Sequence, residues 1–348
     1  MTTLETYGPN KSRLEIGHAV TSSRGERVWD AEKPLKISNS EIQQFKSDRR
    51  TWFLAYYRGL GLKKSEEEIT GFRSLGTRVH AALEHYYTQE SPVLYYLKSI
   101  YEDIEKQLLE RGRMYEVDNL WKEYDLAHAM VEGYLEWIAE EAIDDGLEVV
   151  AAEGVVEVLS HIMGLMLRGK LDQRIVRKVD NARLFRDFKT VGNLTAPVKT
   201  LHLNEQMKFY HLLEHLDSIE KTGEAPVWRT DGALYMMLRR VKRTAQAKPP
   251  FYGQLEVRHN KREIETMWIR TTKTIEEMFD TRAALDAGGD PHYWCPARID
   301  GYASSSDFFP IYNMFDDGSN VEGMIESYYE VVDPDARYNL EEMEKGNE

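Results

Sequence analysis

The feature that most constrains the fold is a change of sequence periodicity near the middle of the chain. Up to that point apolar residues recur at helical spacing. Three later runs, Glu153 to Ser160, Met163 to Arg177 and Arg183 to Val191, carry β-branched residues and two-residue alternation. The last two runs flank the turn-forming pair Asp180-Asn181, which predicts a β-hairpin. A sheet must therefore form from the middle of the chain, with helices packed against it.

The predicted hairpin brings two acidic residues and a lysine together. With the turn at Asp180-Asn181, Asp172 is expected opposite Lys189. Asp187 is then expected on the same face, because side chains alternate along a strand. Two carboxylates beside an amine suit a divalent metal ion bound by hard oxygen ligands next to a phosphate. The hairpin therefore predicts a metal-assisted site.

Size and composition are those of an ordinary globular protein. The chain has 348 residues, of which 42% are hydrophobic and 30% charged. It contains no apolar run near the roughly 20 residues of a membrane span, and no signal peptide opens it. A single cysteine, Cys295, excludes an intramolecular disulfide and a cysteine-only metal cluster within one chain. We therefore expect a cytoplasmic protein.

The net charge of −14 counts against a nucleic-acid partner. Binding depends on a local patch, however, and basic residues cluster at Arg49-Arg50, at 239–243 and at 258–262. Each cluster, taken alone, is best explained as a solvated face. The acidity weakens the nucleic-acid hypothesis without removing it.

The order of the elements predicts one α/β domain with a helical insertion. Helices are expected over 38–57, 74–87, 203–216 and about 263–287, with further strands over 232–238 and 251–257. We expect an extended or flexible arm over 1–35 and a single domain over 36–340. Within that domain, the helical insertion lies at about 92–147, and a segment at about 290–340 packs back on the core. Residues 341–348 form an acidic tail.

Four short motifs occur in a fixed order along these elements. They are Gly76-Thr77-Arg78-Val79-His80, Gly169-Lys170-Leu171-Asp172, Asp187-Phe188-Lys189 and Gln206-Met207-Lys208-Phe209-Tyr210. The first and last are expected on helices and the middle two on strands. This set resembles the PD-(D/E)XK nuclease superfamily in its RecB-type branch, which includes CRISPR-associated adaptation nucleases and phage exonucleases. The likeness spans about residues 36 to 216, and it implies a restriction-endonuclease-like core: a mixed central sheet flanked by helices, with an N-terminal helical region.

The resemblance also implies a role for each motif residue. His80, Asp172 and Asp187 are expected to bind Mg²⁺ or Mn²⁺ together with the Phe188 main-chain carbonyl, and Lys189 to orient or activate the attacking water. The remaining assignments are Gln206 and Tyr210 as contacts to the DNA backbone or supports of the site, Arg49 and Arg50 as DNA-binding residues, and Glu157 as a further acidic residue near the metal.

Each of these residues also has a plain structural explanation. His80 and Glu84 could form a surface pair one helical turn apart. Asp187 and Lys189 could be an exposed pair on one strand, and Tyr210 could be a core residue. For Glu157 the two explanations are evenly balanced. Only the joint occurrence of the four motifs on independent elements favours the functional interpretation.

The chain departs from this branch at the cysteines. Many members carry four that bind an iron–sulfur cluster, one just before the paired basic residues and three near the C-terminus. Here Asp48 precedes Arg49-Arg50, and Trp294-Cys295-Pro296 is followed by no further cysteine. We therefore expect no iron–sulfur cluster and regard Cys295 as a packing residue. Burial of Phe308, Phe309, Tyr312 and Phe315 is expected to hold the C-terminal segment instead.

The resemblance predicts a metal-dependent DNA exonuclease acting on linear DNA with ends. It points to a phage-encoded enzyme of recombination, repair or replication in the host cytoplasm, beside a partner such as a single-strand annealing protein. Three alternatives stay open. They are a structure-specific endonuclease, a catalytically weak DNA-binding accessory protein of the same fold, and a structural protein whose acidic residues are merely solvated.

Overall fold

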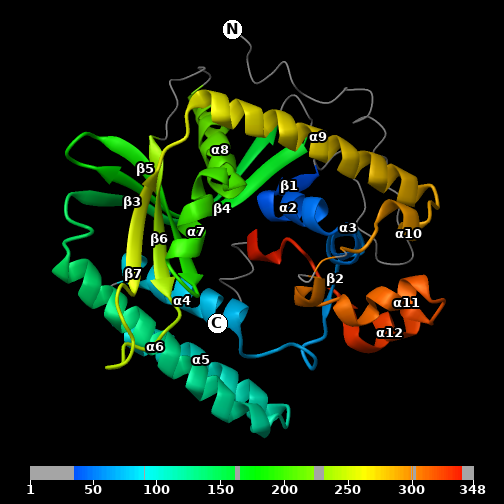
Figure 1. Ribbon diagram of the computed structural model, residues 1–348, viewed down its shortest axis with the longest axis horizontal. Helices are drawn as coiled ribbons and strands as arrows, with labels where there is room; N and C mark the ends of the chain where they lie inside the picture. Colours follow the sequence, from blue (N-terminus) through cyan, green and yellow to red (C-terminus); the bar gives the residue numbers. More distant parts are fainter. Residues whose placement is uncertain are drawn as a thin grey trace.

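The structure is a computed structural model that describes residues 35–89, 91–160, 165–222, 231–298, 300 and 303–338. The expected arm, apart from Leu35, and the expected acidic tail lie outside the described residues. A six-stranded sheet crosses the molecule, with helices against it (Figure 1). Its strands are β1 (Lys36–Ser38), β3 (Leu147–Ser160), β4 (Leu165–Arg177), β5 (Ala182–Val191), β6 (Gly232–Arg239) and β7 (Tyr252–Val257). A two-stranded sheet pairs β2 (Leu60–Leu62) with β8 (Tyr329–Val331).

The long strand β4 organises the main sheet. Strand β3 pairs with it in antiparallel fashion from end to end. On the other edge of β4, the parallel strand β1 lies beside its beginning and the antiparallel strand β5 beside its end. The last pair between β4 and β5 is Gln173 with Arg186. Asp172 and Asp187 follow directly, at the point where β5 leaves β4 and continues beside the parallel strand β6.

The hairpin forms as expected, but its predicted register is wrong by two residues. Arg177 pairs with Ala182, so residues 178–181 form the turn. The cause is the Asp180 side chain, which accepts hydrogen bonds from the Arg177 guanidinium at 2.9 Å and from the Ala182 amide at 3.2 Å. Asn181 adopts a left-handed conformation with φ of 55°. A shift of two residues leaves each side chain on its expected face.

The helices flank the sheet in two groups (Figure 1). The first of the long helices are α4 (Phe72–Thr88), α5 (Val93–Glu110) and α6 (Val117–Glu140), and the later ones are α8 (Glu205–Thr222) and α9 (Lys261–Asp286). The shorter helices are α2 (Asn39–Ser47), α3 (Arg49–Trp52), α7 (Thr195–Thr200), α10 (Pro291–Trp294), α11 (Tyr312–Asp316) and α12 (Val321–Tyr328). None of the helices in the described ranges is long and apolar enough to cross a membrane.

The expected continuous helix over 38–57 is interrupted at Asp48. This residue is extended, with φ of −156°, and its carboxylate accepts hydrogen bonds from the amides of Arg50 and Thr51. It therefore ends α2 and caps α3, as aspartate commonly does. A π-helical turn over Phe53–Tyr57 follows. The helix predicted over 74–87 is confirmed as α4, which begins two residues earlier and ends one residue later.

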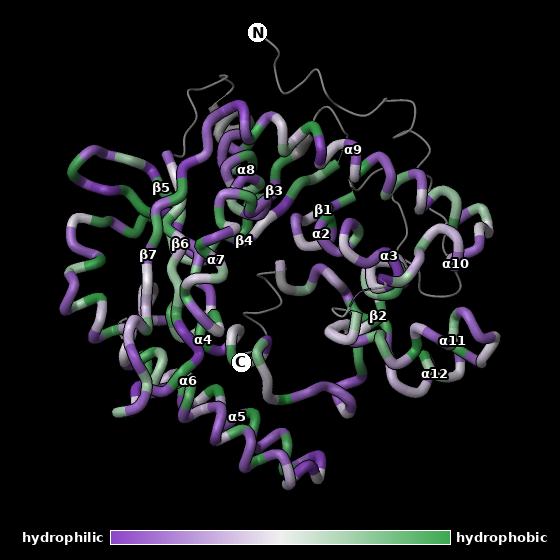
Figure 2. The backbone as a smooth tube through the Cα atoms, in the orientation of Figure 1, coloured by the Kyte–Doolittle hydropathy of each residue, from purple (hydrophilic) through white to green (hydrophobic). Residues whose placement is uncertain are grey.

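Two large hydrophobic clusters and a small third one, around Ile175 and Leu184, share the sheet. One joins the strands to α2, α8 and α9 and includes Phe185, Met207 and Trp268. The other joins them to α4, α5 and α6 and includes Phe188 and Tyr134. Figure 2 shows hydrophobic stretches along the strands, while the outer helix α9 alternates between hydrophilic and hydrophobic residues. Strand β5 contributes to both clusters and is thus held from both sides where its charged residues occur.

Three of the four aromatic residues that were expected to hold the C-terminal segment are buried. Phe308, Tyr312 and Phe315 are 4%, 4% and 8% exposed. Phe309 is 47% exposed, contrary to expectation. It begins a short 3₁₀ turn and meets Tyr312 only edge-on, at 5.9 Å between ring centroids. The division into a single domain with a helical insertion stays a prediction.

Candidate active site

Asp187 lies at the centre of the candidate site. Only 2% of the residue is exposed. Its Oδ1 accepts a hydrogen bond from Lys189 Nζ at 2.9 Å and one from Gln206 Nε2 at 3.4 Å. Oδ2 also lies 2.9 Å from Nζ, but within the described residues it makes no hydrogen bond. Burial raises the pKa of Asp187, against the lowering effect of the Lys189 charge. A buried carboxylate in a strand needs such a partner.

Lys189 is a cation at this site. Burial by itself would lower its pKa, but the charges of Asp187 and Asp172 outweigh the burial, so that the pKa is raised overall. Its ammonium group can therefore donate hydrogen bonds and stabilise negative charge, whereas accepting a proton is disfavoured. The role of Lys189 in orienting or activating water stays a prediction.

Asp172 and His80 complete the group of predicted metal ligands. Asp172 Oδ2 accepts a hydrogen bond from the Phe188 amide at 2.7 Å, which fixes its carboxylate where the two strands part. His80 lies on α4, and its Nδ1 is 3.7 Å from the same oxygen. The buried neighbours Val79 and Leu83 anchor this face of α4. The structure thus brings His80, Asp172 and Asp187 to one place.

Gln206 and Tyr210 reach the site from the first turns of α8. Gln206 Nε2 lies 2.9 Å from the Tyr210 hydroxyl as well as within reach of Asp187. Tyr210 is 8% exposed, so it is a core residue whose hydroxyl supports the site. The close approach of α8 depends on Gly169. A Cβ there would stand 2.7 Å from Leu213 Cδ1 and 2.9 Å from Tyr210 Cε1.

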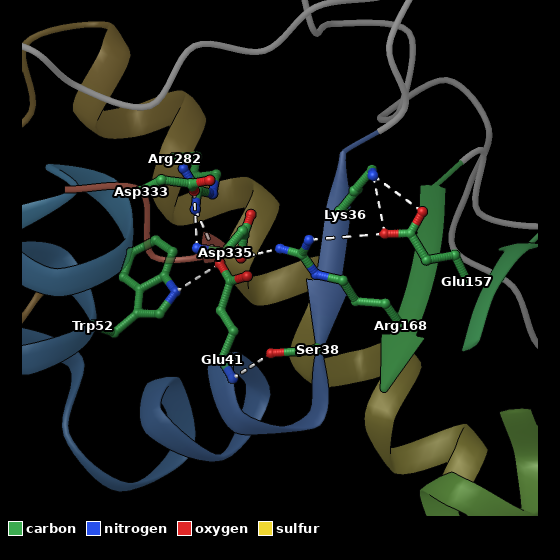
Figure 3. A network of polar contacts seen from close by, with 9 residues as sticks. All are labelled: Lys36, Ser38, Glu41, Trp52, Glu157, Arg168, Arg282, Asp333 and Asp335. Carbon is green, nitrogen blue, oxygen red and sulfur yellow. Dashed lines mark hydrogen bonds and ion pairs between the residues drawn. The ribbon is translucent and has the colours of Figure 1, made fainter. Parts of the chain in front are cut away.

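Glu157 is not brought to this site. It accepts hydrogen bonds from Lys36 Nζ at 2.9 and 3.0 Å and lies 3.9 Å from Arg168 Nη1 (Figure 3). Arg168 also pairs with Asp335 of the C-terminal segment. Glu157 stands opposite Arg168, four residues from Asp172 along β4, or about 13 Å. Two cations already neutralise Glu157, so its predicted place near the metal is corrected.

The structure contradicts DNA contact by Arg50. This residue is 1% exposed, donates from Nε to the Cys295 carbonyl at 2.7 Å, and lies 4.5 Å over the Phe315 ring. It therefore ties the C-terminal segment to α3. Arg49 is half-buried and pairs with Glu277 at 2.5 Å. The Arg50 guanidinium is therefore not available to DNA, whereas DNA contact by Arg49, whose side chain is 36% exposed, stays a prediction.

A residue next to Asp187 was missed by the sequence analysis. Arg186 is 0% exposed. Its guanidinium pairs with Asp144 at 2.5 Å and donates to the Tyr87 hydroxyl at 2.9 Å and to Gln173 Oε1 at 3.2 Å. This network joins β5 to α4 and to the loop after α6. The signal was present, since an arginine in the middle of an apolar strand requires a buried partner.

Comparison with known proteins decides the family. The family model of the PD-(D/E)XK nuclease superfamily matches residues 36–298. The chain belongs to this superfamily. A search of curated proteins found no match. A solved structure titled "Crystal structure of SSO0001" shares 12% identity over 83% of this chain and 95% of that chain, with a TM-score of 0.29. That likeness is too low to carry an argument.

Membership confirms the predicted fold class. The mixed central sheet flanked by helices is consistent with the restriction-endonuclease-like fold of PD-(D/E)XK proteins. The superfamily implies a nuclease that acts on DNA, and its members generally use divalent metal ions such as Mg²⁺ or Mn²⁺. The RecB-type, phage or CRISPR-adaptation subtype stays a prediction.

The donor chemistry at the PD-(D/E)XK site fits such an ion. Asp187 presents a buried carboxylate oxygen that makes no hydrogen bond within the described ranges. Carboxylate oxygens are the ligands that Mg²⁺ and Mn²⁺ prefer. No three His, Cys, Asp or Glu side chains of the described residues are already arranged around a metal position. The Phe188 amide holds Asp172 and the Lys189 ammonium holds Asp187. Binding therefore requires side-chain rotation at these residues.

Proposed function

We propose that the protein is a metal-dependent deoxyribonuclease that removes nucleotides from the ends of linear DNA. The observation that supports this most strongly is the buried Asp187 carboxylate, which lies where β4 and β5 part. Lys189 and Gln206 contact it, and Asp172 lies close by. A structural protein gains nothing from placing two carboxylates side by side at such a point.

The predicted metal ligands are His80, Asp172, Asp187 and the Phe188 carbonyl. An ion held there would act as a Lewis acid, which makes water more acidic and neutralises charge on a phosphate. Rotation of Asp172 away from the Phe188 amide would release one oxygen for this purpose. Asp187 Oδ2 makes no hydrogen bond among the described residues, but it lies 2.9 Å from Lys189 Nζ, so metal binding there would also require this pair to separate.

The remaining residues orient the reactants. Lys189, held by Asp187, would use its cationic group to orient the attacking water and stabilise charge on a phosphate oxygen. Gln206 donates to the same Asp187 oxygen, Oδ1, as Lys189 does, and is itself held by Tyr210. Water then attacks the phosphorus and the bond to the 3′ oxygen breaks. One proton of the water passes to solvent, and the leaving 3′ oxygen takes up a proton, so the products are a 3′ hydroxyl and a 5′ phosphate.

The finer assignment rests on the order of the four motifs. That order resembles RecB-type nucleases, and it supports an exonuclease of phage origin that acts in recombination, repair or replication in the host cytoplasm. A single-strand annealing protein is the kind of partner such an enzyme would have. The absence of three further cysteines from the sequence supports a member without an iron–sulfur cluster.

The experiment is digestion of linear and closed circular DNA of one sequence, in single- and double-stranded form, with Mg²⁺ or Mn²⁺. Linear DNA should be degraded from its ends, circular DNA should persist, and a chelator should stop the reaction. Equal cleavage of closed circles would replace the exonuclease by an endonuclease. DNA binding without cleavage under every condition would favour the accessory-protein alternative.

A further inference from the structure

An exposed aromatic ring stands at the beginning of α4, the helix that carries His80. Phe72 is 74% exposed, and the guanidinium carbon of Arg240 lies 4.0 Å from its ring centroid. A single exposed aromatic side chain needs no explanation. A ring that is stacked with a guanidinium and otherwise open to solvent is, however, the arrangement on which nucleobases stack.

Arg240 differs from the other basic residues of its cluster. Lys242 pairs with Asp125 at 3.0 Å, and Arg243 pairs with Glu136 at 2.6 Å. Arg239 donates to the Lys248 carbonyl at 2.9 Å. In the described part of the chain, no ion pair engages Arg240, and its buried Nε makes no hydrogen bond. Among the described residues, Arg239 and Arg240 are thus the two members of this cluster that no carboxylate engages, and Arg240 is the one whose guanidinium lies against the exposed Phe72 ring.

The pair lies next to the catalytic strand. The Arg240 amide donates to the Val191 carbonyl at 2.8 Å, two residues beyond Lys189. Gly76 follows Phe72 by about one helical turn, or about 6 Å. It packs so closely on β5 that a Cβ there would lie 3.2 Å from Thr190 Oγ1. Phe72 and Arg240 therefore lie near the end of β5, just beyond the candidate active site.

The charges near Phe72 indicate on which side of its ring a nucleic-acid strand can pass. A cavity of about 1150 Å³ opens beside Phe72. Its charged lining residues are Arg73 and the carboxylates of Glu66, Glu67, Glu68 and Asp307, and Arg73 pairs with Asp307 at 3.0 Å, so the carboxylates outnumber the cation. These carboxylates would repel phosphates, whereas Arg240 attracts them. A nucleic-acid strand is therefore expected to pass over Arg240 and to avoid the cavity.

We propose that Phe72 and Arg240 form a subsite for one unpaired nucleotide close to the scissile phosphate. The base stacks on the Phe72 ring, and Arg240 pairs with the phosphate of the same strand. A paired base is already stacked within its duplex, so the subsite selects single-stranded DNA or a frayed end. This inference rests on the proposed nuclease function and adds the form of DNA that the site accepts.

The test measures binding in an Asp187→Asn background, which should leave the probes uncleaved, with Mg²⁺ present. The probes are short oligonucleotides with the fluorescent base 2-aminopurine near the 3′ or the 5′ end, each single-stranded and fully paired. Stacking on Phe72 should quench the fluorescence of a single-stranded probe. Phe72→Ala should remove the quenching and weaken single-strand binding about tenfold or more, with little change for the duplex. Phe72→Tyr should retain both.

Arg240→Gln should weaken single-strand binding and reduce its dependence on the logarithm of salt concentration by about 0.7. Matched controls are Tyr95→Ala, which removes a ring that is 75% exposed on α5, and Arg270→Gln on the exposed side of α9. Both controls should bind as the background protein does. If Phe72→Ala does not fold, Arg240→Gln and Phe72→Tyr decide the question by themselves.

The subsite is disproved if Phe72→Ala and Arg240→Gln bind single strands like the controls. It is also disproved if both substitutions weaken the binding of single-stranded and duplex DNA equally, or if the background protein binds no DNA at low salt. These outcomes leave nuclease activity of the wild-type protein untouched. Failure of the wild-type protein to cleave any DNA would instead refute the proposed function, even with the subsite intact.

Discussion

Buried histidines make the stability of α8 depend on pH at the scale of single residues. Burial lowers the pKa of His211 to about 3, with the nearby His259 adding to the effect. It lowers the pKa of His215 to about 4, with Lys261 adding to the effect. Both residues follow Gln206 and Tyr210 on the same helix. Protonation of these histidines at low pH should therefore destabilise the helix that supports the candidate site.

We predict that the free energy of unfolding falls as pH drops below about 6.5, the ordinary pKa of histidine in the unfolded chain. Below that pH His211 and His215 bind protons in the unfolded chain but stay neutral in the folded protein. The loss of stability therefore continues down to about pH 3 to 4. Denaturant unfolding at pH 7, 5.5 and 4.5 measures it. His211→Leu should flatten the dependence, and an unchanged slope in this variant would contradict the assignment.

Packing between elements holds the site at the next scale, and Gly169 is the residue on which it depends. Gly169→Ala should push α8 away from β4, because its Cβ would lie 2.7 Å from Leu213. We expect a loss of about 1–3 kcal/mol in stability and reduced nuclease activity through displaced Gln206. Gly253→Ala on β7 is the control, since its Cβ would meet Met237 at an ordinary 3.5 Å. Equal effects of the two substitutions would refute this account.

The network around Arg186 joins α4 to β5 and makes a second prediction at this scale. Asp144→Asn should destabilise the protein by about 3–5 kcal/mol, because it leaves the guanidinium buried without a counter-charge. Adding Arg186→Met should recover part of that loss. Denaturant unfolding of the two single variants and the double variant measures the coupling. Strictly additive losses would show that the pair does not act as a unit.

Local patterns predicted the elements well, and contacts distant in sequence explain the errors. Periodicity indicated the strands and the long helices, because burial of one face imposes it. The hairpin register was predicted wrongly because one side chain, that of Asp180, closes the turn. Arg50 resembled a surface cation, yet its partner Cys295 is 245 residues away in sequence. Arg186 and Gly169 likewise owe their roles to α4, α6 and α8, which no local pattern specifies.

At the scale of the whole molecule, polar contacts tie the C-terminal segment to the first helices. The Tyr312 hydroxyl contacts Asp48 and Thr51, at the position where the resemblance would place a cluster cysteine. Tyr312→Phe should cost about 1–3 kcal/mol, because it leaves buried polar groups without a partner, and it should speed proteolysis after residue 303. Phe309→Ala, on an exposed ring, should change neither. Equal protease resistance of Tyr312→Phe and the wild-type protein would contradict this role.

The central claim is that Asp187 makes this chain a metal-dependent nuclease. The most direct measurement compares release of labelled nucleotides from linear DNA by the wild-type protein and by Asp187→Asn, both purified identically and assayed with Mn²⁺. We predict metal-dependent release by the wild-type protein and a loss of at least about a thousandfold in the variant, with folding retained. Equal release by the two proteins, or release that persists with a chelator, would contradict the account.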